Sequence, residues 1–224
     1  IMPSTAKGLG LKLTATLAER LAPELASYAA AEYLSKSYLS LMAAAKKIEP
    51  RVNSTDVSPF VITSYNYGVN GMRRAIEEYG PDYSTVLDHY RSPTFQVAVK
   101  NFYASFLAAR YVAKNADRYF GPRIQEKPLS HQSLLLDSPL SLRRFERVFG
   151  LSREILRAYN PALTHFVWQG WRLIPAGYRL RLPSDTGDLS GELQALGAMP
   201  PESNEFISSK YLVKKGDTAC AIAH

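Results

Sequence analysis

Residues 23–48 repeat apolar side chains at the period of a helix, and this repeat constrains the fold of the chain most strongly. The spacings are four, three, four and three residues, over Leu34, Tyr38, Leu41, Ala45 and Ile48. Such spacing places all of them on one face of a helix. Pro23 suits the first turn, and the Ala-rich composition favours helix. The sequence therefore predicts a helix over residues 23–48.

Further helices follow as far as residue 121, and the pattern of strands is missing from this part of the sequence. Residues 49–59 form a polar connector with two prolines, after which a second helix begins near Pro59 and ends at Gly68. Gly68 suits the left-handed exit of a helix. The later helices are expected over 71–79 with Asn70 as its cap, over 84–90, and from about Thr94 to Tyr119. The last of these presents Val99, Phe102, Phe106, Ala109 and Ala113 on one face. Residues 1–121 therefore read as an all-α domain, or as part of one.

The pattern changes after Pro128. The short apolar stretch "HQSLLLD" precedes two helical segments, "SLRRFERVFG" and "SREILRAYNP", which Gly150 separates. The stretch "YRLRLP" alternates strictly, with Leu180 and Leu182 on one face and arginines on the other, as expected of a half-buried strand. The order strand, helix, helix, strand over residues 129–183 predicts a small α+β module. Residues 184–207 are acidic and rich in Gly, Ser and Pro, and are expected to be a linker.

Charge and composition restrict the possible partners and exclude some functional classes. The net charge is +7, and residues 186–224 are the acidic part, with five acidic side chains against three basic ones. The basic remainder favours a polyanionic partner, although mild basicity also serves solubility. The single cysteine, Cys220, excludes an intrachain disulfide, and the four His lack the spacing of metal ligands. We expect neither metal nor cofactor. No apolar run approaches the ~20 residues that span a bilayer.

Two stretches resemble the lytic transglycosylases, lysozyme-like enzymes that cut peptidoglycan. The stretch "VITSYNYGVNGMRRAI" at 61–76 resembles the Tyr-Asn-x-Gly motif of that family, and "IMPSTAKGLGL" at 1–11 resembles the segment that follows its Gly-Leu-Met-Gln motif. The flanks "ERLAP", "AAEYL" and "NFYASFLAA" are similar to the membrane-bound D-type branch. The resemblance covers roughly residues 1–120, in the correct order. It implies that residues 1–123 are the C-terminal part of a lysozyme-like all-α catalytic domain.

The end of the chain resembles LysM repeats, which bind glycans that contain N-acetylglucosamine. "YLVKKGDTACAIA" at 211–223 is similar to the start of such a repeat, so residues 208–224 are expected to be the truncated start of one. Residues 129–183 resemble a complete but divergent repeat, with Asn160-Pro161 after the second helix and "IPAGYRLRLP" at its end. The Gly-Asp-Thr at its start is missing, which makes us expect weak glycan affinity.

The resemblance implies a reaction and assigns site residues. Enzymes of this family cleave the MurNAc-β-1,4-GlcNAc bond without water and leave 1,6-anhydromuramyl ends, using one Glu. By resemblance this Glu lies before Ile1, so we expect the chain to be inactive by itself. Tyr65 would orient the Glu, while Met2, Asn66 and Gly68 would contact substrate. The resemblance further implies the bacterial cell envelope, on the periplasmic side of the outer membrane, with a lipoprotein anchor before Ile1.

Each of these assignments has an alternative. Tyr65 and Met2 also suit packing, and Asn66 also suits a helix C-cap. The candidate catalytic acids inside the chain are Glu19, Glu32 and Asp56, and for each of them a structural or surface role is favoured. Trp168 and Trp171 offer a platform for sugar rings or a core for the module. The pair Arg73-Arg74 could meet substrate carboxylates or only solvent.

Two functional classes compete with the enzyme. One is a non-catalytic scaffold that only binds peptidoglycan. The other is a helix-turn-helix DNA-binding protein, since "FERVFGLSREILRAYNP" has two helices around a Gly. Glu154 in its presumed reading helix and the strand that follows argue against DNA. We therefore expect peptidoglycan strands, and no nucleic acid, as the partner.

Overall fold

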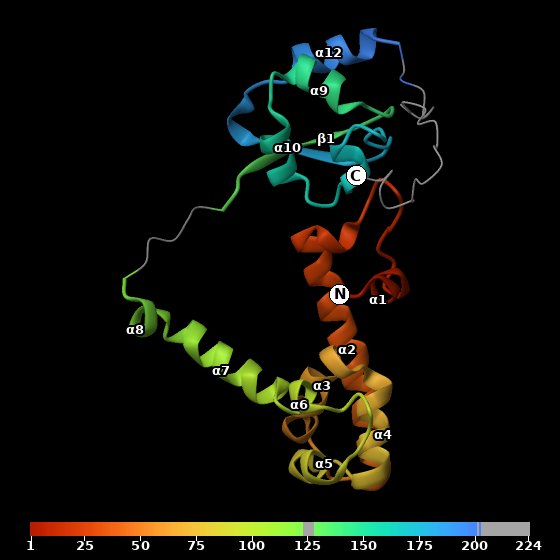
Figure 1. Cartoon of the computed structure of the whole chain (residues 1–224), viewed down its shortest axis with the longest axis vertical. Coiled ribbons are helices and arrows are strands. Elements are labelled where there is room, and N and C mark those ends of the chain that lie inside the picture. The colour runs from red at the N-terminus through yellow and green to blue at the C-terminus, as the bar shows by residue number, and fades with distance from the viewer. Residues whose placement is uncertain (123–127, 201, 203–224) are drawn as a thin grey trace, which may run out of the picture. The chain divides into compact units, whose positions relative to one another are not determined.

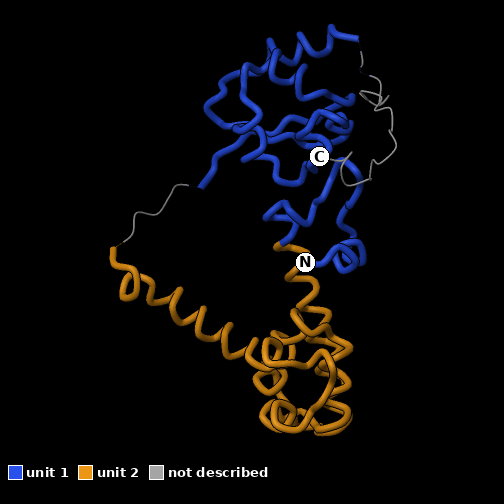
Figure 2. Tube along the Cα trace, in the orientation of Figure 1, with its two compact units in different colours: residues 1–26, 127–224 blue, residues 27–126 orange. Residues whose placement is uncertain are grey.

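The computed structural model describes residues 1–122, 128–200 and 202, and the chain divides into two compact units (Figures 1 and 2). One unit joins residues 1–26 to residues 127–224, and the other comprises residues 27–126. This division differs from the sequence prediction, which placed residues 1–123 in one domain. Backbone contacts explain the difference: the N–H of Ala18 donates to the carbonyl of Ala162 at 2.7 Å, and that of Thr164 to the carbonyl of Thr16 at 3.1 Å.

The unit of residues 27–126 consists of helices. The helix predicted over residues 23–48 is confirmed with both of its limits, as α2 (Pro23–Ile48). Its first four residues belong to the other unit. The remaining helices are α3 (Ser54–Tyr67), α4 (Val69–Tyr79), α5 (Tyr83–His89), α6 (Val97–Lys100), α7 (Phe102–Lys114) and α8 (Ala116–Phe120) (Figure 1).

Three predicted helix limits in this unit were wrong. Helix α3 begins at Ser54, before Pro59, because Asn53 and Asp56 form a capping box: the Asn53 side chain accepts from the Asp56 N–H, and the Asp56 carboxylate accepts from the Asn53 N–H. Helix α4 begins right after Gly68, so Asn70 lies inside it. The long helix expected from Thr94 to Tyr119 is divided at Asn101 and Asn115 into three.

The core of this unit forms where α2 to α5 meet. Its fully buried side chains include Leu41, Phe60, Met72, Ile76 and Val86. The predicted face of α2 contributes Leu41 and Ala45, while Ile48 at its end is exposed. The helix expected from Thr94 to Tyr119 was predicted to bury one face, but only Val99 of that face is buried. Helix α7, which forms most of this range, has no buried residue.

The second unit has the predicted strand, helix, helix, strand order with one addition. Strands β1 (His131–Leu135) and β2 (Arg179–Pro183) pair antiparallel, with Leu134 opposite Leu180. Between them lie α9 (Leu142–Phe149), α10 (Arg153–Tyr159) and the extra short helix α11 (His165–Trp168). Ser141 and Ser152 cap α9 and α10, and Gly150 turns the chain between them at φ +64°. Leu180 and Leu182 are fully buried, which confirms the predicted alternation.

Asn160 ties α10 to β2 from the centre of this unit. Its buried side-chain amide donates to the carbonyls of Leu156 at 2.9 Å and Arg181 at 2.7 Å, and its oxygen accepts from the Arg181 N–H at 2.9 Å. The Tyr178 hydroxyl donates to the same oxygen at 3.3 Å. Burial raises the pKa of Tyr178 to about 12, so this donor keeps its proton at neutral pH.

The remaining elements of this unit are short. They are α1 (Pro3–Gly8) and the 3-10 turns η1 (Glu19–Leu21) and η2 (Ser184–Thr186), followed by α12 (Ser190–Ala198). Helix α12 lies inside the range predicted to be a linker, where it contacts α9. Beyond it, the Glu202 carboxylate accepts from the Ser141 N–H at 2.6 Å and pairs with Arg144 at 3.5 Å. The proposed second repeat, residues 208–224, lies outside the described residues.

Candidate active site

The Tyr-Asn-x-Gly stretch forms the junction between α3 and α4. Gly68 has φ +89° and ends α3 while it starts α4, so it occupies a backbone region that L side chains rarely adopt. Its N–H donates to the Ser64 carbonyl at 2.7 Å. The glycine thus lets the chain turn at once from one helix into the next, and it fixes the end of α3 on which Tyr65 and Asn66 stand.

The ring of Tyr65 packs against another tyrosine, and the residue remains partly exposed. The side chain is 44% exposed, and its ring meets the ring of Tyr33 edge to face at 5.9 Å. The Tyr33 hydroxyl donates to the Ser64 carbonyl at 2.8 Å, which anchors Tyr33 to the same end of α3. Within the described residues no hydrogen bond to the Tyr65 hydroxyl is found. Tyr65 is therefore a partly exposed tyrosine whose ring packs against α2.

Asn66 and Met2 are both exposed. Asn66 lies in the last turn of α3, and because the C-cap is Gly68, Asn66 does not have the capping role considered as its alternative. Met2 precedes α1 with 71% of its side chain exposed, and it belongs to the unit of residues 1–26 and 127–224. The structure therefore groups Tyr65, Asn66 and Gly68 in one unit and places Met2 in the other.

The three carboxylates considered as candidate catalytic acids within this chain each have a partner nearby. The Glu19 carboxylate accepts from the Lys12 N–H at 2.7 Å, Glu32 pairs with Lys36 at 2.6 Å, and Asp56 caps α3. In the described part of the chain, the buried polar side chains are Ser37, Thr63, Ser64, Ser141 and Asn160. No Asp or Glu among the described residues is buried, so none lies in the apolar surroundings typical of a catalytic acid.

The two tryptophans of the module differ in exposure. Trp168 is 6% exposed, and its indole N–H donates to the Leu163 carbonyl at 2.8 Å. Its ring is thus part of the core, and the prediction that it stacks on a sugar needs correction. Trp171 is 40% exposed, with its ring 5.2 Å from His165 and 6.1 Å from Phe166. Trp171, His165 and Phe166, on and after α11, thus form an exposed aromatic cluster.

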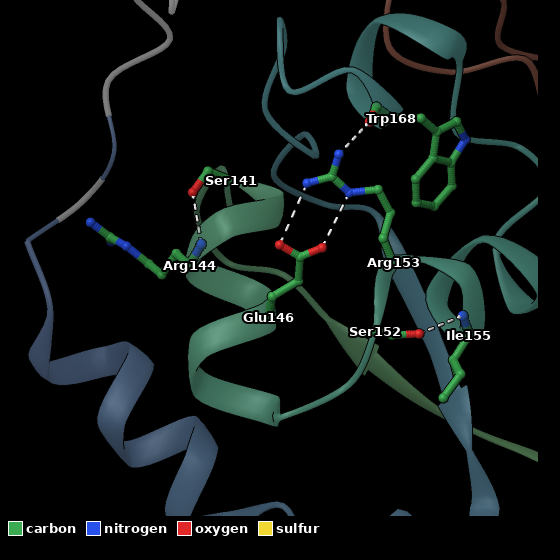
Figure 3. Close-up of polar contacts among 7 residues, drawn as sticks. All are labelled: Ser141, Arg144, Glu146, Ser152, Arg153, Ile155 and Trp168. Carbon is green, nitrogen blue, oxygen red and sulfur yellow. Dashed lines mark hydrogen bonds and ion pairs between the residues drawn. The ribbon is translucent and has the colours of Figure 1, made fainter.

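Three arginines of this unit, Arg144, Arg153 and Arg181, pair with carboxylates, and Figure 3 shows the contacts of Arg153. The Arg153 guanidinium donates to both oxygens of Glu146, at 3.1 and 3.5 Å, and to the Trp168 carbonyl at 3.1 Å. Arg144 pairs with Glu202, and Arg181 pairs with Glu24 at 2.7 Å. Arg153 stands in the first turn of the presumed reading helix, where a DNA-binding protein would need free cations. Through these contacts Arg153 instead connects α10 to α9 and α11.

Sequence reasoning missed the tyrosines that surround the junction. Tyr33 supports Tyr65, while Tyr67 and Tyr90 lie together with their hydroxyls 3.4 Å apart. The signal was the abundance of tyrosine, 14 residues in all, together with the Tyr-x-Tyr spacing at 65 and 67. Only the fold shows which tyrosines meet, because their partners come from α2 and from the loop after α5.

Residues 1–83 match the family model of the transglycosylase SLT domain. The match includes the whole α3–α4 junction and ends at Tyr83, the first residue of α5. It supports a lysozyme-like lytic transglycosylase assignment for this part of the chain. No curated protein matches the chain. No helix in the described ranges combines the length and hydropathy of a membrane span, and no cluster of metal-ligating side chains gathers there.

Proposed function

We propose that the chain is part of a lytic transglycosylase that cleaves the MurNAc-β-1,4-GlcNAc bond of peptidoglycan and leaves 1,6-anhydromuramyl ends. One observation carries the proposal: Tyr65, Asn66 and Gly68 stand at a fixed helix junction inside the region that matches the SLT domain. Tyr65 and Asn66 are both exposed there.

The reaction needs one carboxyl group with two successive roles. Protonated at first, it gives its proton to the glycosidic oxygen while positive charge develops at C1 of the MurNAc ring. The carboxylate then takes the proton of the substrate's own 6-hydroxyl, whose oxygen bonds to C1 and closes the anhydro ring. A hydrogen bond from the Tyr65 hydroxyl would hold the carboxyl in place for both steps. Because no water enters, the products are the anhydro sugar and the released 4-hydroxyl of GlcNAc.

The catalytic acid is proposed to come from outside the described residues. Burial is what raises a carboxyl pKa far enough for a single group to act as acid at neutral pH. The described carboxylates are exposed or partly exposed, and Glu19, Glu32 and Asp56 have local partners. The proposal therefore gives the chain the orienting and substrate-contacting side of the site. If no acid completes the site, the same surfaces would act as the non-catalytic scaffold.

Residues 129–183 are proposed to be a LysM-like module that holds the enzyme on glycan. The supporting observations are the antiparallel β1–β2 pair, with α9, α10 and the short α11 between its strands, and the exposed aromatic cluster at Trp171. The pairing of Arg144, Arg153 and Arg181 with carboxylates favours glycan over DNA. The place of action would then be the bacterial cell envelope, on the periplasmic side of the outer membrane.

Replacing Trp171 by Ala should weaken binding of the chain to insoluble peptidoglycan at low and at high salt alike. An aromatic–sugar contact depends on close apolar packing, so it should survive ~0.3 M salt, where exposed charges are screened. Co-sedimentation at two salt concentrations measures this. Ile155→Ala is the matched control, since Ile155 is 41% exposed on α10 of the same module, and it should bind like the parent chain.

Two results of this assay would contradict the proposal. One is peptidoglycan binding that disappears on adding salt while sequence-selective DNA binding persists, because each phosphate contact steepens the salt dependence of DNA binding. The other is an equal effect of the Trp171 and Ile155 substitutions, which would remove the special role of the aromatic cluster.

A further inference from the structure

A hairpin formed by residues 12–19 lies in the same compact unit as the module of residues 129–183 (Figure 2). At its base the Lys12 N–H donates to the Glu19 carboxylate at 2.7 Å, and the Glu19 N–H donates to the Lys12 carbonyl at 3.0 Å. The hairpin belongs to the residues that match the SLT domain, whereas the module lies outside that match. Any contact between the two therefore joins the family-matching part of the chain to the module.

The turn of the hairpin contacts the connection between α10 and α11 through backbone hydrogen bonds. The Ala18 N–H donates to the Ala162 carbonyl at 2.7 Å, and the Thr164 N–H donates to the Thr16 carbonyl at 3.1 Å. An extended segment that adds to a strand edge makes bonds of this kind. The connection between α10 and α11 thus provides an edge on which the hairpin docks.

Side chains fix the hairpin and the residues that follow it to the module. Leu17 packs against the core of the module, and the Thr164 hydroxyl donates to the Ala15 carbonyl. Beyond the hairpin, Glu24 pairs with Arg181 of β2 at 2.7 Å. Apolar packing, a hydroxyl and an ion pair therefore add specificity to backbone bonds that any sequence could form.

Thr164 connects this docking surface to the exposed aromatic cluster. It is the N-cap of α11, and its carbonyl accepts from the N–H groups of Val167 at 3.1 Å and Trp168 at 3.2 Å. The same helix carries Phe166, whose carbonyl accepts from the Trp171 N–H at 2.9 Å. A continuous series of hydrogen bonds thus leads from the hairpin through Thr164 to the aromatic cluster.

We propose that the hairpin of residues 12–19 positions the aromatic cluster through Thr164, so that glycan binding by the module depends on a segment of the SLT match. The inference rests on the function proposed above, in which the cluster at Trp171 contacts sugar, and it adds the surface that orients the cluster. Coupling between two binding events is reciprocal. If the docked hairpin favours glycan binding, bound glycan must favour the docked hairpin by the same factor. Thr164 is a positioning residue in this scheme, because it acts through α11.

Amide hydrogen exchange, measured by NMR on the whole chain with and without a saturating soluble chitin tetramer, tests the inference. The amides of Ala18 and Thr164 both cross the docking surface. Their exchange should slow about fivefold when the tetramer is bound, the lower end of typical coupling between sites. The Gly150 amide, which bonds within the module at the end of α9, is the internal control and should be unchanged. Trp171→Ala should abolish the slowing.

Substitutions on both sides of the docking surface give independent variants. Thr164→Val removes the hydroxyl and keeps the branched shape, while Leu17→Ala removes apolar contact from the side of the hairpin. Each should weaken co-sedimentation with peptidoglycan about fivefold, the scale of one intramolecular hydrogen bond. Thr164→Ser keeps the hydroxyl and should bind like the parent chain. Ser152→Ala is the matched control, because it removes the hydroxyl that caps α10 without touching the hairpin.

Each outcome decides the question. Slower exchange at Ala18 and Thr164 alone, with weaker binding by the Thr164→Val and Leu17→Ala variants, supports the inference. Equal slowing at Gly150 would mean a general stabilisation of the module and would overturn it. Parental binding by both variants, or an equally large loss in Ser152→Ala, would overturn it too, while an effect of Trp171→Ala would leave the proposed function intact. If the parent chain binds neither peptidoglycan nor the tetramer, both fail.

Discussion

Replacing Tyr65 by Phe should lower kcat about 100-fold in an active enzyme that contains these 224 residues, with little change in glycan binding. The substitution keeps the ring that packs against Tyr33 and removes only the exposed hydroxyl. If that hydroxyl orients the catalytic carboxyl, its loss acts on the proton transfers and not on the affinity for the strand. Release of 1,6-anhydromuramyl products, measured with saturating substrate, gives kcat.

Tyr33→Phe is the matched control for this prediction. It removes a hydroxyl from the ring that touches Tyr65, but that hydroxyl is occupied by the Ser64 carbonyl at 2.8 Å. Losing this hydrogen bond should lower the unfolding free energy by about 1 kcal/mol and leave kcat nearly unchanged. A Tyr65→Phe enzyme with near-parental kcat would make Tyr65 a packing residue. Equal loss of kcat in both variants would point to the stability of the α3 end instead.

Replacing Asn160 by Ala should lower the unfolding free energy of the βααβ module by about 3 kcal/mol. The side chain is fully buried and satisfies the carbonyls of Leu156 and Arg181 and the Arg181 N–H. Its removal leaves the N–H and the carbonyl of Arg181 without these partners, whereas the Leu156 carbonyl keeps the backbone N–H of residue 160 at 3.1 Å. A buried group left unsatisfied costs about 1–3 kcal/mol. Both tryptophans of the chain lie in this module, at 168 and 171, so their fluorescence during urea unfolding reports on it selectively.

Gln132→Ala serves as the control for Asn160. Gln132 also carries an amide, which donates to the carbonyls of Pro183 at 3.4 Å and Gly187 at 3.2 Å, but it lies at the surface on β1 where water can replace it. We expect a loss below about 1 kcal/mol for this variant. If both variants lost the same small free energy, the amide of Asn160 would not be what joins α10 to β2.

The helices that depend on local pattern could be predicted from the sequence, whereas their ends depended on side-chain geometry. The three-four spacing gave the limits of α2, and the alternation of Leu180 and Leu182 gave the buried face of β2. The start of α3 was misplaced because Pro59 resembles a first-turn proline. In the fold the Asn53–Asp56 capping box starts the helix earlier, and Pro59 lies within it.

Contacts between residues far apart in the chain could not be predicted from local sequence patterns. Nothing in residues 1–26 indicated that Ala18 would bond to Ala162, since backbone bonds between distant segments leave no sequence period. The same applies to the site. The motif identified Tyr65, Asn66 and Gly68, but the edge-to-face contact of Tyr65 depends on Tyr33, which comes from α2. Similarly, composition could not tell the buried Trp168 from the exposed Trp171.

The most direct measurement incubates the purified 224-residue chain with isolated peptidoglycan sacculi and assays both bound protein and soluble 1,6-anhydromuramyl products. We expect binding of the chain without product release, because its described part offers Tyr65 and the proposed LysM-like module but no buried carboxyl. Clear release of anhydro products by the pure chain would contradict it. The catalytic acid would then have to be sought among Glu19, Glu32 and Asp56.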